Sequence, residues 1–67
     1  MKRGKLIKYI ERKGCVLKRE GKKHSLYKNM FTGNLSTVPR HPDIKESLCR
    51  KICKDLGIQD ILKPLNL

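Results

Sequence analysis

Two histidines are the side chains best suited to acid–base chemistry near neutral pH, and each lies among cations. His24 follows Lys22 and Lys23, and His41 follows Arg40. Histidine as a residue type exchanges a proton near neutrality, and neighbouring cations stabilise the negative charge that builds up on a reacting phosphate. This combination is suited to cleaving a phosphodiester without a metal ion. The alternative is that each histidine is only a polar surface residue in a basic segment.

Other catalytic chemistries find less support in the sequence. The six acidic residues are scattered, with no pair in a recognisable magnesium-binding motif. The five glycines stand singly, so no phosphate-cradling loop is present. Cys49 and Cys53 lie four residues apart, but no CxxC motif or nearby histidine pair completes a metal site, and we expect both in the core. The sequence predicts neither a metal nor a small-molecule cofactor.

The charge of the chain indicates an anionic partner. Seventeen Lys and Arg residues against six Asp and Glu residues give a formal net charge of +11. Nucleic acid fits this charge best, because basic residues that neutralise phosphates release condensed counterions. RNA is favoured over DNA, because its 2'-hydroxyl is an internal nucleophile that one base can activate. A membrane partner is not expected, since the N-terminal residues 1–4 carry no lipidation signal, and an acidic protein partner remains compatible with RNA binding.

Length and cysteine content predict one small cytoplasmic domain. Sixty-seven residues are enough for a single domain with one modest core, which we place over residues 1–67 with 59–67 as a short extension. The three cysteines are an odd number, and no segment resembling a signal peptide precedes them. We therefore expect free thiols in a reducing compartment.

Hydrophobic periodicity predicts one helix near each end of the chain. The first covers residues 2–13, where Leu6, Ile7 and Ile10 share one face, and Gly14 ends it. In the second, apolar residues recur every four positions from 44 to 56. Asp43 with Glu46 resembles a capping box, with Ser47 as a competing cap. Gly57 followed by Ile58 is typical of a Schellman stop, and residues 60–62 are compatible with one further turn.

Three short runs between the helices predict an antiparallel meander. They cover residues 15–19, 23–28 and 35–38; residues 20–23 form a hairpin loop and Pro39 ends the third strand. Two helices with one apolar stripe each should pack on the same face of this sheet, giving an α+β fold. Strand alternation places His24, Leu26 and Lys28 on one face, and whether Leu26 points into the core stays open.

Three segments in this order resemble the HicA family of toxins from toxin-antitoxin pairs. They are Gly21 to Tyr27 with its Gly-x-x-His pattern, Thr37 to His41 with Val-Pro-x-His, and Arg50 to Ile58 ending in Leu-Gly-Ile. The resemblance covers roughly residues 3–58. It implies a fold like that of double-stranded-RNA-binding domains, in the order helix, three strands, helix.

The resemblance also implies an activity and a partner. Proteins of this family cleave mRNA and halt translation, and the catalytic histidine of the hairpin corresponds to His24. A HicB-type antitoxin would cover that site. As residues that bind the RNA backbone, we predict Lys22, Lys23, Lys28, Arg40 and His41, which are otherwise explained as a solvated charged face.

Two other functions remain open at this stage. The same basic surface suits a non-catalytic RNA-binding module. A DNA-binding repressor would need a recognition helix; the second helix carries Arg50, Lys51 and Lys54, but no helix-turn-helix partner precedes it.

Overall fold

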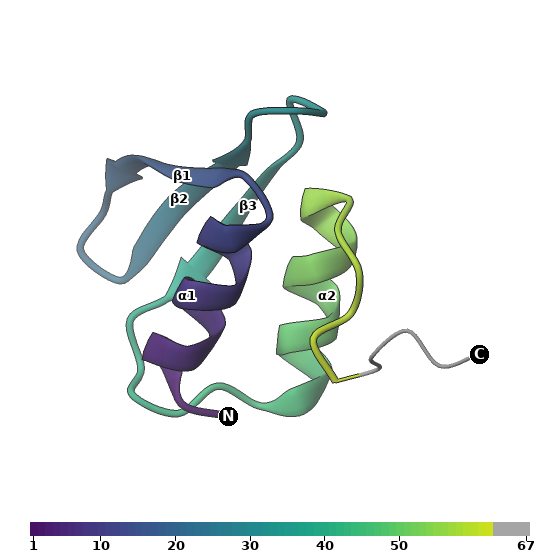
Figure 1. Ribbon diagram of the computed structural model, residues 1–67. Coiled ribbons are helices and arrows are strands. Elements are labelled where there is room, and N and C mark those ends of the chain that lie inside the picture. The colour runs from purple at the N-terminus through teal and green to yellow at the C-terminus, as the bar shows by residue number, and fades with distance from the viewer. Residues whose placement is uncertain (63–67) are drawn as a thin grey trace.

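The computed structural model describes residues 1–62 and has the predicted α+β architecture. Its elements follow in the order α1 (Arg3–Arg12), β1 (Cys15–Glu20), β2 (His24–Asn29), β3 (Leu35–Pro39) and α2 (Glu46–Leu56). The strands form one antiparallel sheet in the order β1-β2-β3, and both helices lie on the same side of it (Figure 1). Within the described residues, no helix has the length and apolar character needed to cross a membrane.

The alternation of β2 decides which side chains face the helices. Ser25, Tyr27 and Asn29 are buried beneath α1 and α2, whereas His24 is exposed on the other face together with half-buried Leu26 and Lys28. Tyr27, and not Leu26, therefore supplies the core side chain of this strand. Because neighbours on a strand point to opposite faces, burial of Tyr27 directs His24 to the open face of the sheet.

The core joins both helices to one face of the sheet. Its buried apolar side chains are Leu6, Ile10, Cys15, Tyr27, Val38, Ile44, Cys49, Ile52, Cys53 and Leu56. The prediction that Cys49 and Cys53 are core residues is confirmed, and burial raises the pKa of all three thiols. Thiols that stay protonated are poor nucleophiles and poor metal ligands.

The predicted N-terminal cap of α2 is wrong. The helix begins at Glu46 with Lys45 in the capping position, and no side chain caps it. Asp43 instead forms a β-bridge with Lys2, and the Ile44 amide donates to the Met1 carbonyl at 2.8 Å. Pairing with the N-terminal segment holds Asp43 and Ile44 beside Lys2 and Met1 and buries Ile44. The helix therefore starts after Ile44, the first residue of the predicted apolar pattern.

The predicted C-terminal stop of α2 is confirmed. Gly57 is left-handed with φ 71°, its amide donates to the Lys54 carbonyl, and the Ile58 amide donates to the Cys53 carbonyl at 3.0 Å. These two bonds are those of a Schellman motif. Residues 61–62 form a turn in which the Leu62 amide donates to the Asp60 carboxylate. The rest of the predicted extension, residues 63–67, lies outside the described residues.

Candidate functional site

Backbone hydrogen bonds bring the two histidine segments to the same end of the sheet. His24, the first residue of β2, pairs with Pro39, the last residue of β3. The Arg40 amide donates to the Lys23 carbonyl at 3.1 Å, and the Gly21 amide donates to the His24 carbonyl at 2.8 Å. The segment that carries His24 is thus held directly against the segment that leads into His41.

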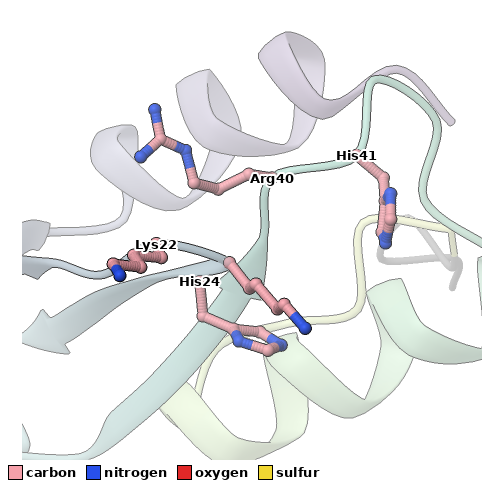
Figure 2. Close-up of a pocket in the computed structure, with 5 residues that line it drawn as sticks. Lys22, His24, Arg40 and His41 are labelled. Atoms are coloured by element: carbon pink, nitrogen blue, oxygen red, sulfur yellow. The ribbon is translucent and has the colours of Figure 1, made fainter.

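Both histidines, His24 and His41, line one open cavity of about 400 Å³, and three further basic residues line it with them: Lys22, Lys23 and Arg40. In Figure 2 the His24 and His41 rings lie on the same side of the strand ends, whereas the Lys22 and Arg40 side chains extend toward the other side. The walls combine two imidazoles with cationic groups. Five of the six residues predicted for the site therefore share one cavity.

Lys28 is the sixth predicted residue and lies elsewhere. It is four residues beyond His24 on the same face of β2, about 14 Å away for a rise of about 3.4 Å per residue. Its cross-strand neighbours are Val16 and Leu35. Lys28 therefore lies outside the histidine cavity but on the same face of the sheet.

The side chain of Arg40 interacts with the hairpin loop and the end of β1. Its guanidinium donates to the Gly21 carbonyl at 3.2 Å and lies 3.9 Å from the Glu20 carboxylate. These contacts link the end of β3 to the hairpin loop before His24. Both charged side chains are about half exposed, so Arg40 retains donors that face solvent.

A bulge in β1 adds a residue that the sequence analysis missed. The register of β1 shifts between Leu17 and Arg19, so Arg19 and not Lys18 lies opposite Leu26. Residues opposite each other point to the same face, which places Arg19 on the face of His24. It borders a second cavity of about 190 Å³, lined by Arg19, Gly21, Lys22, Lys23, His24, Leu26 and Thr37. A strand without a bulge would have directed Arg19 to the helices, and nothing in the sequence marks the bulge.

A hydrogen-bond network on the face of the sheet that the helices cover holds the hairpin in place. The fully buried Ser25 hydroxyl donates to the Glu20 carboxylate and accepts from the Arg3 guanidinium at 2.8 Å. Arg3 also donates to the Pro39 carbonyl at 2.8 Å. Since Ser25 follows His24 directly, this network ties the histidine's backbone to α1, β1 and β3.

We expect Ser25→Ala to lower the free energy of unfolding by about 1–3 kcal/mol, because Arg3 and Glu20 lose their shared partner in a part-buried site. Urea denaturation followed by circular dichroism measures the change. Ser47→Ala is the matched control, since that serine is exposed on α2, and it should leave the urea midpoint almost unchanged. An equal effect of both substitutions would contradict the importance of the network.

The open face of the sheet also carries apolar side chains. Val16 on β1 and Leu35 on β3 are 42% and 52% exposed. Leu26 lies on the central strand β2, two residues before Lys28, which pairs with both of them. With Arg19 and Lys28 beside them, these side chains form a mixed apolar and cationic surface that continues from the histidine cavity. Among residues 1–62, no group of three or more metal-ligand side chains gathers at one place.

Comparison with known proteins adds one finding. A model of the family described as HicA toxin of bacterial toxin-antitoxin systems matches residues 3–58, which span all five helices and strands. Searches of curated proteins and of solved structures returned no match.

Proposed function

The chain belongs to the HicA toxin family, and from this membership we propose that it is a cytoplasmic endoribonuclease that cleaves mRNA without a metal ion and thereby halts translation. The observation that carries the proposal is the cavity that exposed His24 lines together with Lys22, Lys23 and Arg40. A proton-transferring group and fixed cations are what such a reaction requires.

His24 acts as the general base in this proposal. Its imidazole takes the proton of a ribose 2'-hydroxyl, and the resulting oxygen attacks the adjacent phosphorus. Lys22 and Lys23 supply positive charge beside the phosphate as its negative charge increases. The backbone bonds and the Ser25 network hold the backbone of His24 in place before substrate arrives, which limits the reorganisation needed for reaction.

RNA binds across the cavity and the open face of the sheet. Lys22, Lys23, Arg40 and His41 contact the backbone near the cleaved bond, and Lys28 contacts it farther along β2. Arg19 joins this set because the bulge directs it to the same face. The second cavity, with Leu26 and Thr37 in its lining, offers an apolar contact for a base next to the reacting ribose.

A toxin of a toxin-antitoxin family has an antitoxin partner, and we infer one of the HicB type that covers His24. The net charge of +11 suits an acidic protein. The exposed side chains of Val16 and Leu35, beside Lys28, give that protein apolar contacts on the same face of the sheet as His24. Addition of the antitoxin should therefore suppress both RNA binding and cleavage.

A DNA-binding role finds less support on α2. Arg50 lies 3.5 Å from the Asp60 carboxylate, and Lys51 donates to Asp55 at 2.8 Å. These pairs lower the positive charge that α2 offers to a phosphate backbone, so RNA binding at the histidine cavity remains the better candidate.

Incubation of the purified protein with an RNA oligonucleotide in EDTA tests the proposed reaction. We expect new fragments from the RNA and none from an otherwise identical strand in which every ribose is 2'-deoxy, because the nucleophile is then missing. Binding to the RNA without any cleavage would contradict the enzyme and support a non-catalytic RNA-binding module.

We expect Lys23→Ala to weaken RNA binding and to lower the slope of log affinity against log salt by about 1, because one phosphate contact is lost. Titration of a 2'-deoxy strand followed by fluorescence anisotropy at several salt concentrations measures both values. Lys54→Ala removes the same charge from the exposed surface of α2 and should leave the slope unchanged. If both variants lost affinity and salt dependence equally, binding would depend on overall charge and not on the histidine cavity.

A further inference from the structure

We propose that His41 is a second catalytic residue, the general acid that completes the reaction begun by His24. The inference rests on the proposed endoribonuclease activity. It names His41 as the donor of the proton that the leaving 5'-oxygen needs, because His24 acts as the base and removes a proton. It changes His41 from a residue that contacts the RNA backbone into one that protonates the leaving group.

The chemistry of RNA cleavage contains two proton transfers. One imidazole removes the proton from the 2'-hydroxyl, the bond between the 2'-oxygen and phosphorus forms, and the bond between phosphorus and the 5'-oxygen breaks. The 5'-oxygen leaves as an alcohol only if it receives a proton. The products are a 2',3'-cyclic phosphate and a 5'-hydroxyl, so atoms and charge balance without any further reactant. A neutral base and a protonated acid therefore have to lie on opposite sides of one phosphate.

The placement of His41 fits the second role. Both rings line the 400 Å³ cavity, and the Lys23–Arg40 backbone bond joins the residues that immediately precede the two histidines. Figure 2 shows the rings extending from different segments toward the same side of the sheet end. His41 follows the strand that His24 pairs with, so the two rings approach the cavity from separate backbone positions.

Neither imidazole ring has a structural interaction with another residue of the range 1–62. Both histidines are exposed, and no hydrogen bond or ion pair among the described residues uses either imidazole. Arg40 by contrast is bonded to the hairpin loop. A structural histidine normally has a partner for its ring nitrogens, whereas a proton-transfer group has to keep a nitrogen accessible to substrate.

The other polar groups of the cavity are poorly suited to the acid's role. Lysine and arginine as residue types hold their protons far above neutral pH, so they donate them reluctantly to a leaving oxygen. Histidine as a residue type both loses and gains a proton near neutrality. Lys22, Lys23 and Arg40 therefore provide charge, and His41 is the remaining side chain of the cavity that fits proton donation.

A substrate with an altered leaving group separates an acid from a binding residue. The probe is an RNA oligonucleotide in which sulfur replaces the 5'-oxygen at one cleaved bond, because a thiolate leaves without being protonated. The matched oligonucleotide has oxygen at that position. Cleavage of both is measured under single-turnover conditions for the unsubstituted protein, His41→Ala and His24→Ala, and affinity is measured on a 2'-deoxy strand.

We expect His41→Ala to cleave the oxygen substrate about 10²- to 10⁴-fold more slowly and the sulfur substrate nearly as fast as the unsubstituted protein. His24→Ala should lose both activities, because the base is needed for either leaving group. Affinity for the 2'-deoxy strand should change little in His41→Ala. Since His41 is exposed, its replacement should leave the circular dichroism spectrum intact.

Other results overturn the inference. Equal losses of His41→Ala on the two substrates would make His41 a binding or positioning residue, and an unchanged rate on the oxygen substrate would give it no role. Rescue of His24→Ala by the sulfur substrate would reverse the two roles. Each of these leaves the endoribonuclease itself standing, whereas failure of the unsubstituted protein to cleave either substrate would overturn both proposals.

Discussion

His24→Ala is expected to abolish RNA cleavage and, in cells, the growth arrest caused by expression of the toxin. Loss of a positioned general base lowers the rate by about 10²- to 10⁴-fold. His24 begins β2 with its ring exposed, so its removal takes no side chain from the core. Rates on an RNA oligonucleotide in EDTA and colony counts after induction measure the two effects.

The control for this substitution is a variant that keeps the fold but lies away from the cavity. Lys54→Ala on α2 should cleave RNA and arrest growth like the unsubstituted protein. His24→Ala should also retain its circular dichroism spectrum and much of its affinity for RNA, because the neighbouring lysines remain. Normal cleavage by His24→Ala would move the chemistry to another part of the protein.

Leu6→Ala is expected to destabilise the fold by about 2–5 kcal/mol, because it leaves a cavity where α1 packs against the sheet. Leu6 is fully buried in the core cluster. At roughly 0.05–0.15 kcal/mol per residue, a domain of this length has a total stability of only about 3–10 kcal/mol. The substitution should therefore remove much or all of the cooperative unfolding transition.

Urea denaturation followed by circular dichroism measures this loss. Leu35→Ala makes the same chemical change at a side chain that is 52% exposed, and it should shift stability by less than about 0.5 kcal/mol. Similar midpoints for the two variants would contradict the assignment of Leu6 to the core.

Periodicity predicted both helices well because each of them buries one apolar side. Ile52 and Leu56 share the buried face of α2, whereas Leu48 is half buried and Ile44 reaches the core from the segment before the helix. The start of α2 was missed because Asp43 pairs with Lys2, a contact between distant segments that local capping patterns do not contain. The Schellman stop at Gly57 depends on local conformation alone and was predicted correctly.

The part of the candidate site that depends on residue type could be predicted from the sequence. The part that depends on the pairing register of the strands could not. Histidines next to cations indicated His24 and His41, and the structure brings both segments to one cavity. The sequence left the direction of Leu26 open, because it does not show that Tyr27 is the buried residue. Arg19 was missed because its face depends on a bulge that pairing with β2 creates.

Identification of the RNA ends by mass spectrometry, after cleavage by the purified protein in EDTA, tests the central claim most directly. Activation of a 2'-hydroxyl by an imidazole predicts a 2',3'-cyclic phosphate on one fragment and a 5'-hydroxyl on the other. Fragments with 5'-phosphate ends, or RNA that stays intact, would contradict the claim that His24 in its basic cavity is the base of a ribonuclease.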